Sequence, residues 1–149
     1  IELGSGVDGT AANTLSDYET GTFTPTLNGA TTAGSPTYSL QKGIYTKIGN
    51  LVHCVIRVQI SNLGSLDGFV RVLGLPFTAN STADNQSSAS IGYGGGLNIT
   101  AGTSLGGFIQ TGDNYLRLTH WDVGDGTSYL DDAEFSATGS LMINLTYQT

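Results

Sequence analysis

Residues 51–61 read Leu-Val-His-Cys-Val-Ile-Arg-Val-Gln-Ile-Ser, and this stretch decides the fold class. Small or branched apolar side chains occupy every second position: Val52, Cys54, Ile56, Val58 and Ile60. Side chains at a period of two share one face of a β-strand. We therefore predict a strand whose one face lies in a hydrophobic core, with Cys54 as a small buried apolar residue of that face.

The other face of the same strand mixes apolar and polar side chains, namely Leu51, His53, Val55, Arg57 and Gln59. This mixture is too apolar for free solvent and too polar for a core. We therefore expect another chain to cover it, which makes these residues the candidate subunit interface.

Further strands are predicted where β-branched and aromatic residues lie between turn residues. Gly49-Asn50 and Gly112-Asp113-Asn114 are expected to close hairpins, Pro25 favours a sheet edge, and Gly43 indicates a bulge. The other predicted strands are Thr22–Leu27, Thr37–Ile48, Phe69–Leu73, Ala89–Leu97, Phe108–Thr111, Tyr115–Trp121 and Leu141–Tyr147. Short strands at this spacing predict an all-β, antiparallel β-sandwich or jelly-roll-like domain.

Length and composition agree with one domain of this class. The chain has 149 residues, 22 glycines and only 11% charged residues, and its single cysteine excludes an intrachain disulfide. Residues 1–14 lack a period-two pattern and are expected to be a linker, with the domain at residues 15–149. Because the sequence begins at Ile1 without a methionine, we expect it to be the end of a longer protein.

The charge excludes some classes of partner. Five basic residues stand singly among twelve acidic ones, giving a net charge of −7. A nucleic-acid surface needs clustered Lys and Arg, so we expect no nucleic-acid partner. No apolar run is long enough to span a membrane and no signal-peptide pattern is present, so we expect no membrane insertion.

Several stretches resemble one family. Residues 15–27 (LSDYETGTFTPTL), 43–52 (GIYTKIGNLV) and 74–77 (GLPF), with the closing strand from Gly139 to Tyr147, are similar in order and spacing to a C-terminal module of bacteriophage tail fibres and tailspikes. The chain departs from that pattern at Ser16 and Thr20, where the family has acidic residues, and at Phe23, where Trp is commoner.

The resemblance implies a β-sandwich that associates as a homotrimer at the distal end of a fibre, for trimerisation, receptor recognition or both. It also implies that any depolymerase chemistry lies upstream, outside this module. The matching motifs read as structural, so no binding residue is carried over from the family.

The sequence offers no catalytic constellation. Its serines lie outside a nucleophile elbow, and His53, in the middle of a strand, is more simply explained as a structural residue. Neighbouring carboxylates, Asp131 with Asp132 and Asp122 with Asp125, are expected to point into solvent, and their spacing is not that of a calcium loop. We therefore predict no enzyme activity and no cofactor, and no metal site is assigned, although a metal bound in the loop from Asp122 to Asp132 stays open.

The stretch from Tyr115 to Tyr129 is the candidate ligand site. Aromatic faces stack on the apolar face of a pyranose, and neighbouring polar groups bond its hydroxyls. The candidate glycan-binding residues are Tyr115, His120, Trp121, Asp122 and Tyr129. The alternative is that Trp121 caps the core or a subunit contact.

The sequence therefore predicts a distal trimerisation and receptor-binding domain of a phage tail fibre or tailspike, located on the virion and exposed outside the cell, with a bacterial surface polysaccharide as partner. Two alternatives stay open: a trimerisation clamp without a ligand, and the same module in a head-decorating fibre. The sequence does not name the host or the glycan.

Overall fold

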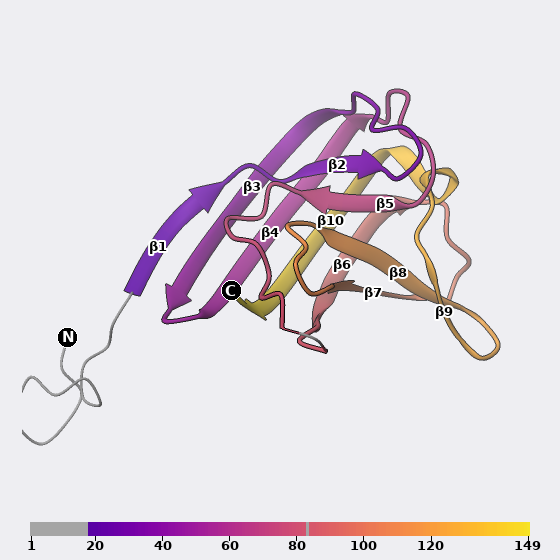
Figure 1. Ribbon diagram of the computed structural model, residues 1–149. Coiled ribbons are helices and arrows are strands. Elements are labelled where there is room, and N and C mark those ends of the chain that lie inside the picture. The colour runs from indigo at the N-terminus through magenta and orange to yellow at the C-terminus, as the bar shows by residue number, and fades with distance from the viewer. Residues whose placement is uncertain (1–17, 83) are drawn as a thin grey trace, which may run out of the picture.

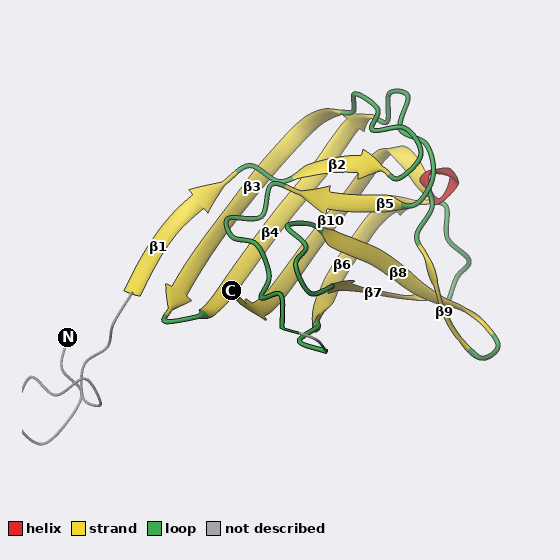
Figure 2. Ribbon diagram, in the orientation of Figure 1, coloured by secondary structure: helices red, strands yellow, loops and turns green. Residues whose placement is uncertain are grey.

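The computed structural model describes residues 18–82 and 84–149, so the predicted linker at residues 1–14 lies outside the described residues. The described chain is almost entirely β-strand, with one 3₁₀-helix, η2 (Asp132–Glu134), drawn in red in Figure 2. The strands are β1 (Tyr18–Phe23), β2 (Thr26–Gly29), β3 (Thr37–Ile48), β4 (Leu51–Asn62), β5 (Val70–Leu73), β6 (Ser87–Leu97), β7 (Ser104–Ile109), β8 (Leu116–Val123), β9 (Gly126–Tyr129) and β10 (Phe135–Gln148).

All strand pairs are antiparallel and belong to one sheet, in the order β1-β3-β4-β10-β6-β7-β8-β5-β2, with β9 paired to β8. The sheet folds over on itself, so that β7, β8, β5 and β2 cross the long strands β3, β4, β10 and β6 at a steep angle (Figure 1). The two layers of the sandwich are thus halves of one curled sheet. This confirms the predicted all-β antiparallel fold.

The two edges of the sheet are joined by the chain itself. Strand β1 pairs only with β3 and strand β2 only with β5, yet they are separated by just Thr24 and Pro25. The predicted single strand Thr22–Leu27 is therefore wrong. Proline has no N–H group to donate to a neighbouring strand. The strand therefore ends before Pro25, and the chain passes from one layer to the other at this residue.

The core lies between the two layers. The predicted inward face of β4 is confirmed, since each of its five side chains is at most 1% exposed. Facing residues of the other layer, such as Val70, Val72, Leu116 and Leu118, are fully buried as well. At about 25 cal/mol per Å² of apolar surface, this burial is the main stabilising contribution to the fold.

Both predicted glycine turns are present. Ile48 pairs directly with Leu51 across Gly49-Asn50, and Gly49 has a φ of +58°, as primed hairpin turns require. Gly112 has a φ of +77° in the connection between β7 and β8, which pair antiparallel. The two hairpins set the register of the strands that carry the candidate sites.

Gly43 is not a bulge, contrary to the prediction. It pairs regularly with Phe23 on one side and Ile56 on the other, and the bulges of β3 lie between Thr37 and Leu40. A Cβ atom at Gly43 would lie 2.6 Å from the Phe23 ring, and one at Gly21 would lie 2.6 Å from the Tyr45 ring. Each glycine thus accommodates an aromatic ring from the neighbouring strand, which attaches the edge strand β1 to β3.

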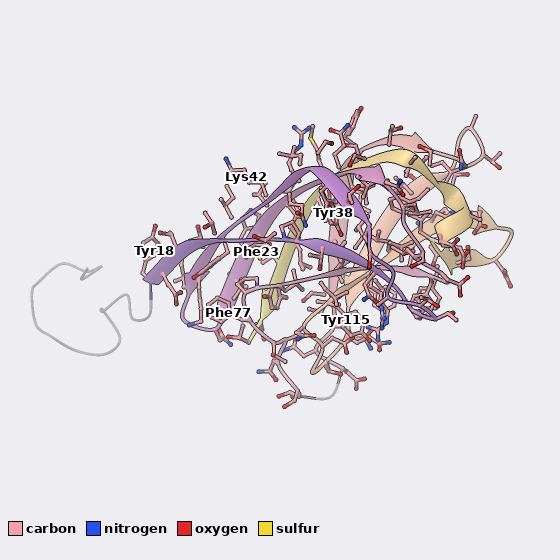
Figure 3. All side chains as sticks on the ribbon, turned by 90° about the horizontal axis from the view of Figure 1, so that it is seen from above. Tyr18, Phe23, Tyr38, Lys42, Phe77 and Tyr115 are labelled. Carbon is pink, nitrogen blue, oxygen red and sulfur yellow. The ribbon has the colours of Figure 1, made fainter. Side chains whose placement is uncertain are left out.

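The stretches that carry the family resemblance meet in one place. The Tyr45 ring packs edge-on against Phe77 at 5.3 Å between centroids, and Lys47 lies over the same ring. The Tyr147 hydroxyl donates to the Phe77 carbonyl at 2.9 Å. Figure 3 shows Phe23 and Phe77 on one side of β3 and Lys42 on the other. These motif residues hold the edge and the final strand together, which supports their structural interpretation.

Two elements were not predicted, β9 and η2, and both lie in the stretch that was expected to be an acidic loop. Strand β9 forms a hairpin with β8, and η2 follows it. Within the described residues, no helix has the length and apolar character needed to cross a membrane.

Candidate functional site

The face of β1, β3, β4, β10 and β6 that points away from the core is here called the outer face. Directly opposite residues of antiparallel strands point to the same side. The predicted interface residues of β4 therefore share the outer face with Ile44 of β3 and Met142 of β10. All large apolar side chains exposed among the described residues lie on this face, except Trp121 and Tyr129: Tyr18, Ile44, Ile48, Leu51, Val55, Tyr93 and Met142.

Two cations lie side by side on the outer face. Lys42 of β3 is directly opposite Arg57 of β4, and like charges at such positions destabilise a sheet. Among the described residues, no carboxylate forms an ion pair with either of them. The outer face therefore combines uncovered apolar area with two uncompensated charges, in a chain that is otherwise acidic.

The outer face is hollowed toward its edge strand β1. A shallow groove of about 360 Å³ is lined by residues of β1, β3 and β4, including Ile44, His53 and Val55. The His53 Nδ1 atom lies 2.9 Å from the Oγ1 atom of Thr146, its direct neighbour on β10. Of the predicted interface residues, His53 and Val55 line this groove.

The second candidate surface lies on the opposite layer, where β8 and β9 form a hairpin. Trp121 at the end of β8 is 62% exposed, so it is not a core residue. It borders a hollow of about 450 Å³ lined by the β6–β7 turn and the β8–β9 hairpin, here called the Trp121 hollow: Thr100, Ala101, Gly102, Thr103, Trp121, Asp122 and Gly124. The hollow offers one large aromatic face among hydroxyl and carboxylate groups.

Tyr115 lies on the same layer but is enclosed by arginines. The guanidinium carbon of Arg71 lies 5.0 Å from the centroid of its ring and that of Arg117 lies 4.7 Å from it. Arg117 also donates to the Tyr115 hydroxyl at 2.7 Å and forms an ion pair with Asp113. Phe69 and Phe108 extend this alternation of rings and guanidinium groups. Tyr115 is therefore part of a cation–π ladder, and its faces are occupied by the chain itself.

Tyr129 of β9 connects the ladder to the Trp121 hollow. Its ring stacks on Phe69 at 4.7 Å between centroids and lies 6.3 Å from Phe108. It pairs with Thr119, and β-strand alternation places Thr119 and Trp121 on the same face of β8. Tyr129 is 43% exposed and lines a smaller hollow of about 340 Å³. Of the predicted site residues, Asp122 thus shares the hollow of Trp121, and Tyr129 lines a separate one.

His120 is buried and does not lie on the exposed surface beside Trp121, contrary to the prediction that it contacts a glycan. It alternates with Trp121 along β8 and therefore points inward, with only 3% of the residue exposed. Its Nε2 atom faces Ser128 Oγ at 2.8 Å, Glu134 Oε1 at 3.2 Å and Asp122 Oδ2 at 3.4 Å. Asp122 borders the hollow while its side chain is held by Ser128.

Most of the acidic residues after β9 have structural partners rather than pointing freely into solvent. Asp132 accepts the Gly68 N–H at 2.9 Å, and Glu134 accepts the Asp131 N–H at 2.7 Å. Burial, followed by the hydrogen bond with Asp132, raises the pKa of Asp131. These contacts fix η2 against the strand layer.

Cys54 is confirmed as a buried core residue. Burial raises the pKa of its thiol to about 12, and burial likewise raises the pKa of its neighbour Tyr147. A thiol of this kind is protonated at neutral pH and therefore a poor nucleophile.

The functional surfaces contain residues that sequence reasoning did not select. The Arg71–Tyr115–Arg117 arrangement depends on β5 and β8 being neighbours, with Arg71 directly opposite Arg117. Glu134 reaches His120 only because the chain after β9 brings η2 back to β8. Nothing in the local sequence of the β6–β7 turn indicates that its threonines line a hollow beside Trp121.

Comparison with known proteins identifies a solved structure of similar fold. No family model matches the sequence, and no curated protein matches it. Among solved structures, the chain is similar to the crystal structure of the Dettilon tailspike protein, with a TM-score of 0.76 and 22% sequence identity. The match covers 88% of this chain but only 24% of that protein. The fold is thus one that forms part of a tailspike protein.

Proposed function

We propose that this domain is the self-associating, receptor-binding module of a phage tail fibre or tailspike. In this proposal the outer face joins three copies of the chain, and the Trp121 hollow binds a polysaccharide of the bacterial surface. The domain would be exposed on the virion, outside the host cell, at the tip of the fibre. Its role is assembly and binding rather than catalysis.

The observation that carries the proposal is the outer face. Single exposed apolar residues are normal on any protein, but a contiguous apolar patch marks an interaction site. Here the patch follows five strands, borders a groove, and contains two cations that have no carboxylate partner among the described residues. Acidic groups of a neighbouring copy are the natural partners for these cations, because each chain has a net charge of −7.

The number of copies comes from the resemblance to tail-fibre modules, and the likeness to part of a tailspike protein supports it at the level of fold. Contacts between unlike patches on identical chains close into a ring when the rotation from one copy to the next adds up to a full turn. A ring of three buries part of the outer face of every chain and gives all of them the same environment.

The receptor role is supported by Trp121. Its large aromatic ring is 62% exposed and borders a hollow, so it is available to a ligand. An indole face can stack on a pyranose ring, while the threonines and Asp122 can bond hydroxyl groups. Three acidic chains repel a strongly acidic capsule, so we expect the glycan to be neutral or weakly charged.

An array of purified bacterial capsular and O-antigen polysaccharides tests the receptor role. The wild-type domain should bind a narrow set of neutral or weakly charged glycans. Trp121→Ala should bind the same glycans about thirtyfold more weakly, because an aromatic anchor contributes about 2 kcal/mol. Gln86→Ala, in the exposed loop before β6 and on neither of the two surfaces, is the control and should bind as the wild type does. If Trp121→Ala bound equally well, the hollow would not be the receptor site.

A further inference from the structure

Four polar side chains converge on one point behind the Trp121 hollow. They come from three elements: His120 and Asp122 from β8, Ser128 from β9, and Glu134 from η2. The ligand atoms of His120, Asp122 and Glu134 all lie within 4.8 Å of one another. We call these four residues the His120 cluster.

The separations within the cluster fit the coordination of a metal ion. In a tetrahedral zinc site with ligands at 2.0–2.1 Å, neighbouring ligand atoms lie roughly 3.3 Å apart. The Nε2 atom of His120 lies 3.2 Å from Glu134 Oε1 and 3.4 Å from Asp122 Oδ2. One imidazole nitrogen with two carboxylate oxygens is a donor set that Zn²⁺ and similar divalent ions accept.

Two carboxylates converge on one buried imidazole nitrogen. The hydroxyl group of Ser128 donates to Asp122 Oδ1 at 2.6 Å, and Asp122 Oδ2 and Glu134 Oε1 both face His120 Nε2. The His120 side chain is 4% exposed, and its other ring nitrogen, Nδ1, is buried without a hydrogen-bond partner among the described residues. This buried side chain is thus aimed at two carboxylates from two different elements.

We propose that His120, Asp122 and Glu134 bind one divalent transition-metal ion, Zn²⁺ being the best fit, with Ser128 Oγ or a water molecule as the fourth ligand. The ion would join the β8–β9 hairpin to η2 and thereby fix the side of the Trp121 hollow that Asp122 forms. This proposal does not rest on the function proposed above, because metal binding is measured on the purified domain without any glycan.

The structure also sets an expectation for the affinity. Histidine ligands usually donate their second N–H to an acceptor, and losing that partner weakens metal binding by roughly 10–100-fold. His120 Nδ1 has no such acceptor. We therefore expect binding that a strong chelator reverses, rather than a permanently occupied site.

Calorimetric titration of the chelator-treated domain with Zn²⁺ tests the proposal. The expected result is one ion per chain and a rise in the melting temperature with added Zn²⁺. Glu134→Gln should weaken binding at least tenfold, although its amide oxygen can still accept the Asp131 N–H that Glu134 accepts. Asp125→Asn removes a charge from the same hairpin outside the cluster and should bind as the wild type does.

A second measurement on the wild-type domain does not depend on the folding of any variant. Co²⁺ in a four-coordinate site of nitrogen and oxygen ligands absorbs visible light much more strongly than hydrated Co²⁺. We expect that absorption to appear on titration with Co²⁺ and to disappear when Zn²⁺ is added. The proposal is overturned if neither metal binds, or if Glu134→Gln binds as well as the wild type. It is also overturned if His53→Gln, at the exposed histidine of the outer face, removes binding.

Discussion

The outer face and the opposite layer differ in how the chain covers its own apolar and charged groups. On the layer that carries β5 and β8, Arg71 and Arg117 are directly opposite, yet Tyr115 lies between them and Asp113 pairs with Arg117. On the outer face, Lys42 and Arg57 are also directly opposite, but no described residue lies between them or neutralises them.

The apolar residues show the same contrast. Tyr129 stacks on Phe69 within its own layer, whereas Ile44, Leu51 and Val55 have exposed side chains on the outer face. Among the described residues, the layer of β5 and β8 leaves only Trp121 and Tyr129 as exposed large apolar side chains, while the outer face leaves a set that extends over five strands. The proposed assembly would cover that set.

The largest effect is expected from a charge placed on the outer face. Val55→Asp puts a carboxylate at the wall of the groove, where the proposed assembly would bury it without a partner. The domain should then remain folded but become a monomer, as measured by light scattering after gel filtration. Val55→Thr, of similar volume, should stay assembled. A trimeric Val55→Asp variant would show that this face is free in the assembly.

Substitutions of inward-pointing and outward-pointing residues of β8 should differ sharply in their effect on the free energy of unfolding. Leu118→Ala empties a fully buried position and should lower the free energy of unfolding by about 2–5 kcal/mol. Trp121→Ala, three residues further along the strand, should change it by about 0.5 kcal/mol or less, because the side chain is mostly exposed. Urea denaturation of both variants measures the difference. Equal losses would mean that Trp121 packs as a core residue.

The cation–π ladder should stabilise the completed layer. Arg117→Met removes the ion pair with Asp113 and the hydrogen bond to Tyr115, and it should cost about 1–3 kcal/mol of unfolding free energy. Lys42→Met, which removes a cation of the outer face without a described ion pair, is the control and should cost much less. Similar losses in the two variants would contradict the contrast between the layers.

The smallest effect concerns pH and the core beneath the outer face. The pKa of Cys54 is raised from its ordinary value of 9.0 to about 12 in the folded chain. Above pH 9 the unfolded chain releases a proton that the folded chain keeps, so stability should fall as pH rises, by roughly 1.4 kcal/mol per pH unit. The raised pKa of Tyr147 adds to this loss above pH 10. In Cys54→Ala the free energy of unfolding should begin to fall at a higher pH, as measured by urea denaturation at several pH values. If the fall began at the same pH as in the wild type, the buried thiol would not be its cause.

The sequence predicts local features well where one strand decides them. The alternation of β4 sorted its buried and exposed residues correctly, and the glycine turns placed two hairpins. His120 was assigned to the candidate glycan site because of its residue type and its place beside Trp121. The alternation of β8 already places these two residues on opposite faces. The wrong prediction at Gly43 has another cause, because glycine is favoured both at a β-bulge and where an aromatic ring packs closely on a strand.

Other features depend on which strands become neighbours. The short connection at Pro25 joins the two edges of the sheet, and no local pattern shows that the chain changes layers there. Strand β9 begins at a glycine in a stretch that looks like a loop, and it is a strand only because β8 lies beside it. Glu134 meets His120 across fourteen residues of sequence, so the His120 cluster could not be read from spacing alone.

The central claim, that the outer face is covered by other copies of this chain, is tested most directly by sedimentation equilibrium of the purified domain. The account predicts a mass three times the chain mass of 15.4 kDa at micromolar concentration. A stable monomer at that concentration would contradict it.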